Sequence, residues 1–501
     1  MSVEPISSEF EKVYAKGKPQ VVWNTLIADL ETPVSVMLKL ANNKPNSFLL
    51  ESVEGGSVRG RYSIIGMDPD IIWRCHGNKA EIKYVTQNTK SKFKICPSNT
   101  IESLKELVKN SQIDLPESMP PMAAGLVGYL GYDTVTLMEN IPSTRTDPLK
   151  LPDGLFIRPT IMAIFDLVKD TVIIVTPVRP EKDISAKSAY NSAKKRLENV
   201  LYDFNRKLVH KRPKKSELKL TKNPISNTTP STFKKMVRKA KEYIFAGDIF
   251  QVVLSQRFTI PFHLPAFALY RALRRTNPSP FLFFLNFGNF SIVGSSPEIL
   301  IRLRDGKLTL RPLAGTRPRG ANATEDQTLE KELLKDEKEL AEHLMLLDLG
   351  RNDIGRVAKI GTVSVTEKMV IEKYSHVMHI VSNIEAQIDK KYDAVNALVA
   401  AFPAGTVSGA PKIRAMEIIH ELELEKRGVY SGVVGYFSAN GSMDTCIVLR
   451  TALVKDEKVY IQSGAGIVAD SDPEKEQQEC KNKALAVVKA VEEAIRYAGG
   501  S

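Results

Sequence analysis

Two pairs of glutamates constrain the fold more than any other feature of this sequence. Glu339 with Glu342, and Glu476 with Glu479, stand three residues apart, so each pair shares one face of a helix. An isolated pair of this kind is typical of a solvated helix face. If the fold brings the two helices together, however, the four carboxylates form a cluster of the hard oxygen ligands that Mg²⁺ prefers.

The flanking residues favour a metal site over a solvated face. Glu342 leads into the run 343–347 (HLMLL), which predicts a helix buried nearly all round. A carboxylate in such surroundings is costly to bury unless it is paired or bound to a metal. The second pair follows Gly464-Ala465-Gly466, at a predicted strand end, and Asp472-Pro473, a typical helix start. A glycine turn beside a helix start can direct backbone N–H groups at an anion.

Composition predicts an ordinary globular protein. The chain has 501 residues, 43% hydrophobic and 26% charged, enough for two large cores. No apolar run has the length of a membrane span, and residues 1–18 lack the apolar segment of a signal peptide. The cysteines show no C-x-x-C spacing, which argues against a disulfide framework or zinc ribbon and favours the cytoplasm. They are Cys75, Cys96, Cys446 and Cys480.

The net charge of +12 does not by itself predict a nucleic-acid partner. The excess is mostly lysine, it is concentrated around 206–222, and few aromatic residues are interleaved with it. This pattern favours a solvated basic linker, and an anionic small substrate fits the charge at least as well. A non-enzymatic basic binding protein would also leave both glutamate pairs unexplained. We therefore expect neither a nucleic-acid nor a membrane partner.

The segment 207–231 predicts a linker between an N-terminal domain (1–206) and a C-terminal domain (232–497), because it is polar and poor in apolar residues. Strand signals joined by short turns, with helices in blocks, predict an α+β fold with antiparallel sheets. Strands are predicted at 47–50, 62–65, 71–74, 161–165, 171–175, 250–258, 281–285, 291–294, 299–304, 307–311, 432–438, 444–454 and 458–463. Helices are predicted at 186–208, 232–246, 330–349, 393–401, 411–424 and 473–497.

Two segments have alternative interpretations. The sequence RPLAGTRPRG at 311–320 is either a charged surface loop or a carboxylate-binding loop, since arginine forks match carboxylates. The strand 250–258 alternates, which is consistent with a solvent-facing edge as well as with a buried strand. Its predicted core face carries Phe250, Val252, Leu254 and Phe258, and its other face carries Gln251, Ser255 and Arg257.

Taken together, these segments resemble the chorismate-utilising enzymes, and most closely the large subunit (component I) of anthranilate synthase. The resemblance covers essentially the whole chain and is densest from about 233 to 490. It implies large antiparallel β-sheets packed face to face, with helices on the outside. The matching motifs are GDIFQVVLSQR (247–257), NPSP (277–280), GSSPE (294–298), RPLAGTRPRG (311–320), EHLMLLDLGRND (342–353), HVMH (376–379), 402–412, DTCIVLR (444–450) and 464–483.

The resemblance implies a Mg²⁺-dependent lyase that converts chorismate and ammonia into anthranilate and pyruvate, the first step of tryptophan synthesis. Glu342 and Glu479 are then the main metal ligands, with Glu339 and Glu476 acting through water. The metal would hold the ring carboxylate of the substrate as a Lewis acid and template.

The same resemblance implies roles for other residues. Glu298 would protonate the departing C4 hydroxyl while ammonia attacks C2. His379 would be the acid/base of the second step, in which pyruvate is lost, although a lone histidine is more often structural. The residues implied to bind the substrate are Gly315, Thr316, Tyr430, Arg450, Gly464, Ala465, Gly466 and Lys483.

Two positions favour anthranilate over the other products made on this fold. Aminodeoxychorismate synthases typically carry a nucleophilic lysine where this chain has Ala314. Isochorismate and salicylate synthases typically carry a water-activating lysine where this chain has Gln251 at the catalytic position. A neutral amide is not a base and cannot activate water, so the nucleophile must already be reactive when it enters the site, as ammonia is. Aminodeoxychorismate synthase and isochorismate synthase remain the alternatives.

The source of ammonia is predicted to be a second protein. The sequence has no G-x-C-x-G nucleophile motif of a glutamine amidotransferase. The resemblance therefore implies a separate glutamine amidotransferase subunit (component II), assembled with this chain in a heterotetramer. The chain alone is expected to use free ammonium.

A second set of motifs implies feedback inhibition by L-tryptophan. LLES (49–52) is followed by GRYS (60–63), and in the family this region binds tryptophan together with the segment after NPS. Interdomain packing is the alternative interpretation of these residues. Tryptophan is expected to favour a state with weaker chorismate affinity. The implied allosteric residues are Glu51, Ser52, Pro280, Phe281 and Leu282, and many relatives have tyrosine and methionine at the last two positions.

Overall fold

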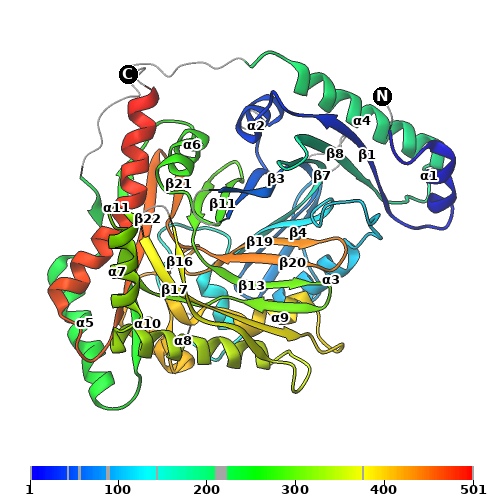
Figure 1. Cartoon of the computed structure of the whole chain (residues 1–501). Coiled ribbons are helices and arrows are strands. Elements are labelled where there is room, and N and C mark those ends of the chain that lie inside the picture. Colours follow the sequence, from blue (N-terminus) through cyan, green and yellow to red (C-terminus); the bar gives the residue numbers. More distant parts are fainter. Residues whose placement is uncertain are drawn as a thin grey trace.

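The computed structural model describes residues 3–41, 44–54, 58–85, 91–142, 145–208, 223–374 and 377–498. Most of the predicted linker (209–222) and His376 of the HVMH motif lie outside the described residues. The described chain is a mixture of helices and antiparallel strands (Figure 1).

The helices are α1 (Ser7–Tyr14), α2 (Pro33–Leu40), α3 (Thr100–Asn110), α4 (Ala186–Asn205), α5 (Pro230–Phe245), α6 (Ala266–Thr276), α7 (Ala323–Leu333), α8 (Glu337–Gly355), α9 (Ala394–Ala401), α10 (Lys412–Leu422) and α11 (Pro473–Ala498), with 3₁₀ turns η1 (Tyr132–Leu137) and η3 (Gly405–Val407). The strands of the first part of the chain are β1 (Gln20–Ile27), β2 (Ser47–Glu54), β3 (Val58–His76), β4 (Lys79–Tyr84), β5 (Lys94–Ile95), β6 (Gly125–Leu130), β7 (Gly154–Asp166), β8 (Thr171–Val178) and β9 (Ile225–Ser226). Those that follow are β10 (Gln251–Pro261), β11 (Phe281–Asn286), β12 (Ser291–Ser296), β13 (Ile299–Arg304), β14 (Lys307–Leu310), β15 (Leu313–Pro318), β16 (Ser364–Lys373), β17 (Val377–Gln387), β18 (Gly409–Ala410), β19 (Val433–Ser438), β20 (Met443–Ile447), β21 (Thr451–Lys455) and β22 (Lys458–Ile467).

The strands form two antiparallel sheets that share the long strands β3 and β7. The first sheet has the order β1-β8-β7-β3-β2-β11-β12-β21-β22-β10, with β9 and β18 beside β10. The second has the order β5-β4-β3-β7-β6-β19-β20-β13-β14-β17, with β15 beside β14 on the same edge of β17 and β16 on the opposite edge. Strands from before and after 207–231 pair with each other, as β2 does with β11 and β6 with β19. The domain boundary itself stays a prediction.

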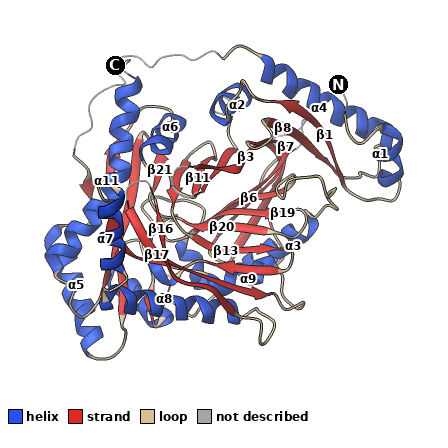
Figure 2. Cartoon of the chain, viewed as in Figure 1, coloured by secondary structure: helices blue, strands red, loops and turns tan. Residues whose placement is uncertain are grey.

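Alternation along the strands builds three layers of core. Phe283 and Leu285 of β11 pack between the sheets with residues of β6, β19 and β20. Leu282 and Phe284 face the other way and pack with α6 and α11. Helices α1, α2, α4, α6 and α11 cover the outer face of the first sheet, and α3, α8 and α9 cover that of the second (Figure 2). This arrangement confirms the predicted fold of face-to-face antiparallel sheets with outer helices.

Several local predictions were wrong. The helix predicted at 330–349 is two helices, because the Asp336 carboxylate accepts hydrogen bonds from the N–H groups of Lys338 and Glu339 and so begins α8. Helix α8 is not buried all round, since 48% of Leu344 is exposed. The strand predicted at 444–454 is interrupted at Arg450, whose φ is 48°. Phe250, predicted to face the core, precedes β10 and is 72% exposed.

Both faces of β10 are buried, so the strand is not a solvent-facing edge. Gln251, Ser255 and Arg257 are each less than a tenth exposed, as are Val252 and Leu254 on the opposite face. The four cysteines are free. In the part of the chain that the structure describes, no helix combines the length and apolarity that a bilayer crossing requires.

A buried ion pair between Arg427 and Glu423 holds the segment between α10 and β19 against its neighbours. Arg427 is 1% exposed and donates to both carboxylate oxygens of Glu423, at 2.6 and 2.9 Å. It also donates to the carbonyl oxygens of Val253 (2.6 Å) and Val407 (2.8 Å). Glu423 accepts further hydrogen bonds from the N–H and hydroxyl of Ser255. The network ties β10, η3 and the end of α10 together.

Replacement of Arg427 should therefore destabilise the chain strongly. Arg427→Leu removes both direct hydrogen bonds of Arg427 to the buried Glu423 carboxylate and leaves only Arg145, 3.9 Å away, as its cation. We expect the free energy of unfolding to fall by about 3–5 kcal/mol. Urea denaturation followed by circular dichroism measures the change. The control is Arg351→Leu, because Arg351 and its partner Asp348 are both mostly exposed. Equal effects of the two substitutions would contradict the prediction.

Candidate active site and an adjoining cavity

The two sheets and helices α8 and α11 meet where the predicted catalytic residues lie. The first sheet contributes β10 and β22, paired so that Val253, Leu254 and Ser255 stand opposite Gly466, Ala465 and Gly464 respectively. The second sheet contributes β15 and β17, and α8 packs on both of these strands. The Gln251 amide at the start of β10 donates a 3.0 Å hydrogen bond from Nε2 to Glu342 Oε1 on α8. This bond joins the first sheet to the helix that carries the first glutamate pair.

The structure brings the four glutamates within electrostatic range of one another. Burial raises the pKa of Glu342, and the negative charges of Glu339 and Glu479 raise it further. Burial also raises the pKa of Glu476, and Glu479 again adds to the effect. The two helices therefore bring carboxylates that repel one another within electrostatic range, and their joint binding of a metal ion stays a prediction.

The donor chemistry at this point fits a hard divalent cation. All four groups supply carboxylate oxygen, and Glu476 Oε2 is buried without a hydrogen-bond partner. As they stand, Glu479 pairs with Lys483 (2.7 Å) and Glu339 with Arg317 (3.1 Å). Within the described residues, no three His, Cys, Asp or Glu side chains form a ready-made metal cluster. Glu479 and Lys483 are each about half exposed, so this pair can separate at little cost when a cation binds.

Glu298 is a buried acid between β12 and β13. It is 5% exposed, and burial raises the pKa of its carboxyl to about 8, against the opposing influences of Thr406, the Leu313 backbone and Arg450. At neutral pH the group is therefore protonated and can donate a proton.

His379 on β17 is held in one tautomer. Its Nδ1 lies 3.0 Å from the Gly315 carbonyl oxygen and 3.0 Å from Thr316 Oγ1. A carbonyl only accepts, so Nδ1 carries the proton and Nε2 keeps its lone pair. Gly315 forms a bulge in β15 with φ 67°, a conformation that suits glycine and aims its carbonyl at the imidazole. Burial lowers the pKa of His379 to about 4, so the ring is neutral and basic at Nε2 at pH 7.

Arg450 supplies a cation beside Glu298. Its backbone lies in the left-handed region, a strained conformation of the kind that clusters at functional sites. Burial lowers the pKa of its guanidinium, whereas Tyr374 and Glu298 act in the opposite direction. Because Glu298 is itself neutral at pH 7, the guanidinium keeps its capacity to bind the carboxylate of a ligand.

Tyr430, Lys483 and the glycines of β22 lie together. A Cβ added at Gly464 would meet the Tyr430 hydroxyl and the Leu254 carbonyl, each at 2.8 Å, so only glycine fits there. Lys483 Nζ donates to the Gly464 carbonyl at 3.1 Å. Ala465 is buried, and Thr316 is exposed. The structure thus places the predicted substrate-binding residues around the same junction of β15, β17, β22 and α11.

The arginines of the segment 311–320 are engaged with the protein. Most of it is β15, and its arginines bind carboxylates of the protein itself. Arg311 pairs with Glu367 and Glu372, Arg317 with Asp336 and Glu339, and Arg319 with Asp326. These pairs do not test whether the segment binds a carboxylate of a ligand, and that interpretation stays a prediction.

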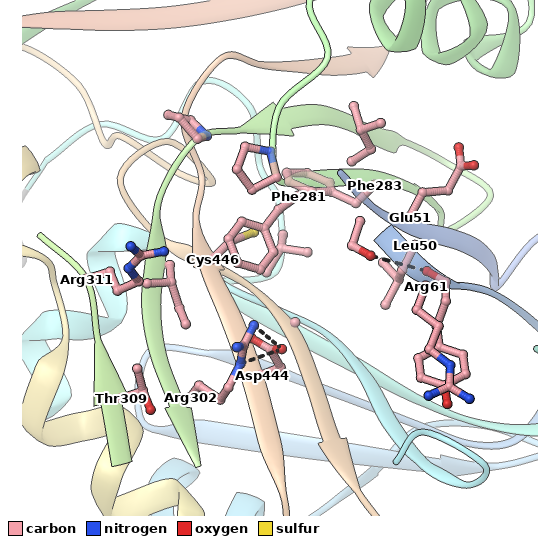
Figure 3. A pocket seen from close by; sticks show the side chains of 18 of the residues that line it. Leu50, Glu51, Arg61, Phe281, Phe283, Arg302, Thr309, Arg311, Asp444 and Cys446 are labelled. Carbon is pink, nitrogen blue, oxygen red and sulfur yellow. Dashed lines mark hydrogen bonds and ion pairs between the residues drawn. The ribbon is translucent and has the colours of Figure 1, made fainter. Parts of the chain in front are cut away.

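A cavity of about 1050 Å³ lies beside this site, between the two sheets (Figure 3). All five predicted tryptophan-site residues line it: Glu51, Ser52, Pro280, Phe281 and Leu282. They come together because β2 pairs with β11, with Phe281 opposite Ser52 and Leu282 opposite Glu51. The Glu51 carboxylate already accepts hydrogen bonds from Arg274 (2.8 Å) and the Tyr270 hydroxyl.

Sequence reasoning missed the opposite wall of this cavity. There Arg302 pairs with Asp444 at 2.9 Å, and Arg311, Glu372 and Tyr374 also face the cavity. Glu372 and Tyr374 lie at the end of β16, a strand that the sequence did not predict. The apolar residues 369–371 and 377–381 were the available signal for the β16–β17 hairpin.

Comparison with known proteins identifies the family of the chain. The family model for chorismate binding enzymes matches residues 48–489. The chain belongs to the chorismate binding enzyme family. It is 56% identical to anthranilate synthase component 1 of Cereibacter sphaeroides over 489 residues, 98% of each chain.

Solved structures of other chorismate binding enzymes have the same fold. Anthranilate synthase component I from Streptococcus pneumoniae superposes with a TM-score of 0.74 at 36% identity, covering 85% of this chain and 92% of that one. The menaquinone-specific isochorismate synthase of Escherichia coli superposes with a TM-score of 0.71 over 97% of this chain and 99% of its own, at 20% identity. The second likeness concerns the fold alone.

Gly466 offers a test of the bond between β10 and α8 in this chorismate binding enzyme. A Cβ at this position would lie 2.7 Å from Gln251 Nε2. Gly466→Ala should therefore displace the amide from Glu342 and lower the free energy of unfolding by about 1 kcal/mol, measured by urea denaturation. The control is Gly355→Ala at the end of α8, where nothing lies within 4 Å and alanine gains up to about 1 kcal/mol of helix propensity. A stable Gly466→Ala variant with the Gln251–Glu342 bond intact would contradict the prediction.

Proposed function

We propose that this chain is the large subunit of an anthranilate synthase and converts chorismate and ammonia into anthranilate and pyruvate. The observation that carries the proposal is the 56% identity, over 98% of both chains, with a protein named anthranilate synthase component 1. The residue at position 251 supports it independently. Gln251 is neutral and its amide is engaged with Glu342, so it cannot activate water for an isochorismate-type reaction. The free cysteines support a reducing, cytoplasmic location.

The junction of the two sheets provides a binding site for a substrate with two carboxylates. Arg450 and Lys483 supply positive charge, and the Tyr430 hydroxyl supplies a hydrogen-bond donor next to Gly464. The backbone of Gly464, Ala465 and Gly466 and the bulge at Gly315 and Thr316 complete the walls. Glu342 and Glu479, with Glu339 and Glu476 in support, would hold Mg²⁺. The metal, when bound, neutralises and positions a substrate carboxylate.

Two buried groups would move the protons of the reaction. In the first step ammonia attacks C2 while Glu298 gives its proton to the C4 hydroxyl, which leaves as water. In the second step His379 accepts the C2 proton at Nε2, the bond from the ring to the enolpyruvyl oxygen breaks, and the ring becomes aromatic. The enolpyruvate that leaves takes up a proton at its methylene carbon and so becomes pyruvate. The hydrogen bond from Nδ1 to the Gly315 carbonyl keeps Nε2 available for this role.

Ammonia would be delivered by a glutamine amidotransferase subunit, and L-tryptophan would inhibit by occupying the cavity. The printed name "component 1" of the relatives supports the existence of a second component. The five predicted tryptophan-site residues that line one cavity support the inhibitor site.

Product analysis tests the proposal directly. The purified chain, incubated with chorismate, Mg²⁺ and ammonium, should produce anthranilate, which is detected by its fluorescence. Glutamine should not replace ammonium in the isolated chain, and chelation of Mg²⁺ with EDTA should abolish the reaction. Isochorismate or aminodeoxychorismate as the product instead would overturn the assignment.

The pH dependence tests the role of Glu298. Because its pKa is raised to about 8, the acid is protonated below that pH, and kcat/KM for chorismate should fall as pH rises through about 8. Glu298→Gln should lower kcat by about 10²–10⁴-fold and remove the Glu298-dependent fall. The control is Asp133→Asn, a second buried acid, whose carboxylate accepts from the Gly428 N–H. A fall near pH 8 that persists in Glu298→Gln would assign it to another group.

A further inference from the structure

One side chain, Tyr374, lies against both the cavity and the catalytic histidine. It follows β16 at the turn into β17, and it is among the residues that line the cavity. Its ring meets the His379 imidazole edge-on, with centroids 5.5 Å apart and planes at 64°. The backbone of Tyr374 is fixed by hydrogen bonds from Arg319 Nη1 to its carbonyl (2.7 Å) and from its N–H to the Val377 carbonyl (2.8 Å).

A chain of polar contacts runs from the Tyr374 hydroxyl along the cavity wall. The hydroxyl donates to Glu372 Oε2 at 2.8 Å, and Glu372 Oε1 accepts from Arg311 Nη2 at 2.6 Å. Arg311, Glu372 and Tyr374 all line the cavity, and Figure 3 shows Arg311 on the wall opposite Glu51 and Leu50. Burial and the nearby Glu372 raise the pKa of Tyr374, so the hydroxyl stays protonated and remains the donor.

His379 has two kinds of support. On β15, Gly315 and Thr316 fix Nδ1, and at the ring edge the aromatic face of Tyr374 excludes water. The charged and titratable groups that act on this pair are Arg450, Glu298, Glu372 and Arg311. The first two belong to the proposed catalytic site, and the last two belong to the cavity wall. Tyr374 therefore lies between the charged groups of the proposed catalytic site and those of the cavity wall.

We propose that Tyr374 is a positioning residue that couples the cavity to His379. A ligand that displaces Arg311 or Glu372 breaks the hydrogen bond of the Tyr374 hydroxyl. The Tyr374 ring, which orients His379 and shields it from water, then moves. The inference rests on the proposed function, in which L-tryptophan is the ligand and His379 is the base. It assigns the step by which occupation of the cavity reaches the reacting atoms.

Two glutamates on β16 provide a matched pair of variants. Glu372 and Glu367 both pair with Arg311 Nη2, at 2.6 and 3.1 Å, but only Glu372 also accepts from Tyr374. Glu372→Gln should weaken inhibition of anthranilate formation by L-tryptophan about tenfold or more, whereas Glu367→Gln should change it by less than about twofold. Binding of L-tryptophan, measured by calorimetry with and without chorismate, should lose its dependence on chorismate in Glu372→Gln alone.

Two substitutions of Tyr374 separate the ring from the hydroxyl. Tyr374→Phe keeps the ring beside His379, so the acid limb of kcat/KM should stay near the pKa of about 4, while inhibition weakens as in Glu372→Gln. Tyr374→Leu admits water to His379, which raises its pKa toward the ordinary value. On acidification, the Tyr374→Leu variant should then lose activity at a higher pH than the wild-type chain does. The substitution should also lower kcat by a larger factor than it raises KM. Titration of ¹⁵N-labelled His379 by NMR follows the same shift without turnover.

The possible results distinguish this inference from the proposed function. No anthranilate from the wild-type chain would overturn the proposed function, and the NMR titration would still test the support of His379 by Tyr374. Anthranilate formation without any inhibition by L-tryptophan would overturn the coupling, as would equal inhibition of Glu372→Gln and Glu367→Gln. An unshifted His379 pKa in a folded Tyr374→Leu variant would show that the ring is only part of the packing.

Discussion

Repulsion among the glutamate carboxylates of α8 and α11 is the constraint around which the proposed active site is arranged. Glu339 and Glu342 lie on α8, and Glu476 and Glu479 lie on α11. Besides burial, the charges of Glu339 and Glu479 raise the pKa of Glu342, and the charge of Glu479 raises that of Glu476. The protein offsets this repulsion with a lysine of α11 itself and with side chains from two other elements, β15 and β10. Lys483 pairs with Glu479, Arg317 with Glu339, and the Gln251 amide donates to Glu342. Gln251 and Arg317 fix α8 relative to β10 and β15, and Lys483 also donates to the Gly464 carbonyl and so ties α11 to β22. The contacts that balance charge therefore also position residues of the proposed substrate site.

Burial acts on the two proposed proton-transfer groups in opposite directions and makes both neutral at pH 7. Desolvation disfavours a charge of either sign, so it raises the pKa of Glu298 to about 8 and lowers that of His379 to about 4. Glu298 is left with a proton to give, and His379 is left with a lone pair to accept one. A single physical cause, exclusion of water from the junction of the two sheets, thus prepares an acid and a base. Arg450 reinforces the neutral state of His379 and remains available for an anion.

The sequence predicted the features that depend on local spacing and missed those that depend on tertiary contact. Helical spacing was enough to predict that each glutamate pair shares a face, and β2 and β11 were predicted as strands because their apolar runs are uninterrupted. Phe250 was misplaced because period-two alternation does not fix where a strand begins: β10 starts at Gln251, and Phe250 before it is exposed. The start of α8 had a signal, since Asp336 and Glu339 have the spacing of a helix cap. The strand β16 had only a weak sequence signal, because two irregularities in its pairing with β17 break the alternation of apolar and polar residues around Met369.

The roles of Arg311 and Tyr374 were beyond sequence reasoning for a different reason. Motif 311–320 shows three arginines, but only the fold reveals that their partners are the protein's own carboxylates. The pairing of β2 with β11 and of β6 with β19 interleaves strands from both parts of the chain, so both parts contribute residues to the cavity. Strands β15 and β16, on either side of β17, carry both the wall residues and the groups that hold His379. A rigid hydrogen-bonded sheet therefore connects the two sites over a few residues, and coupling between them needs only the movement of side chains such as Glu372.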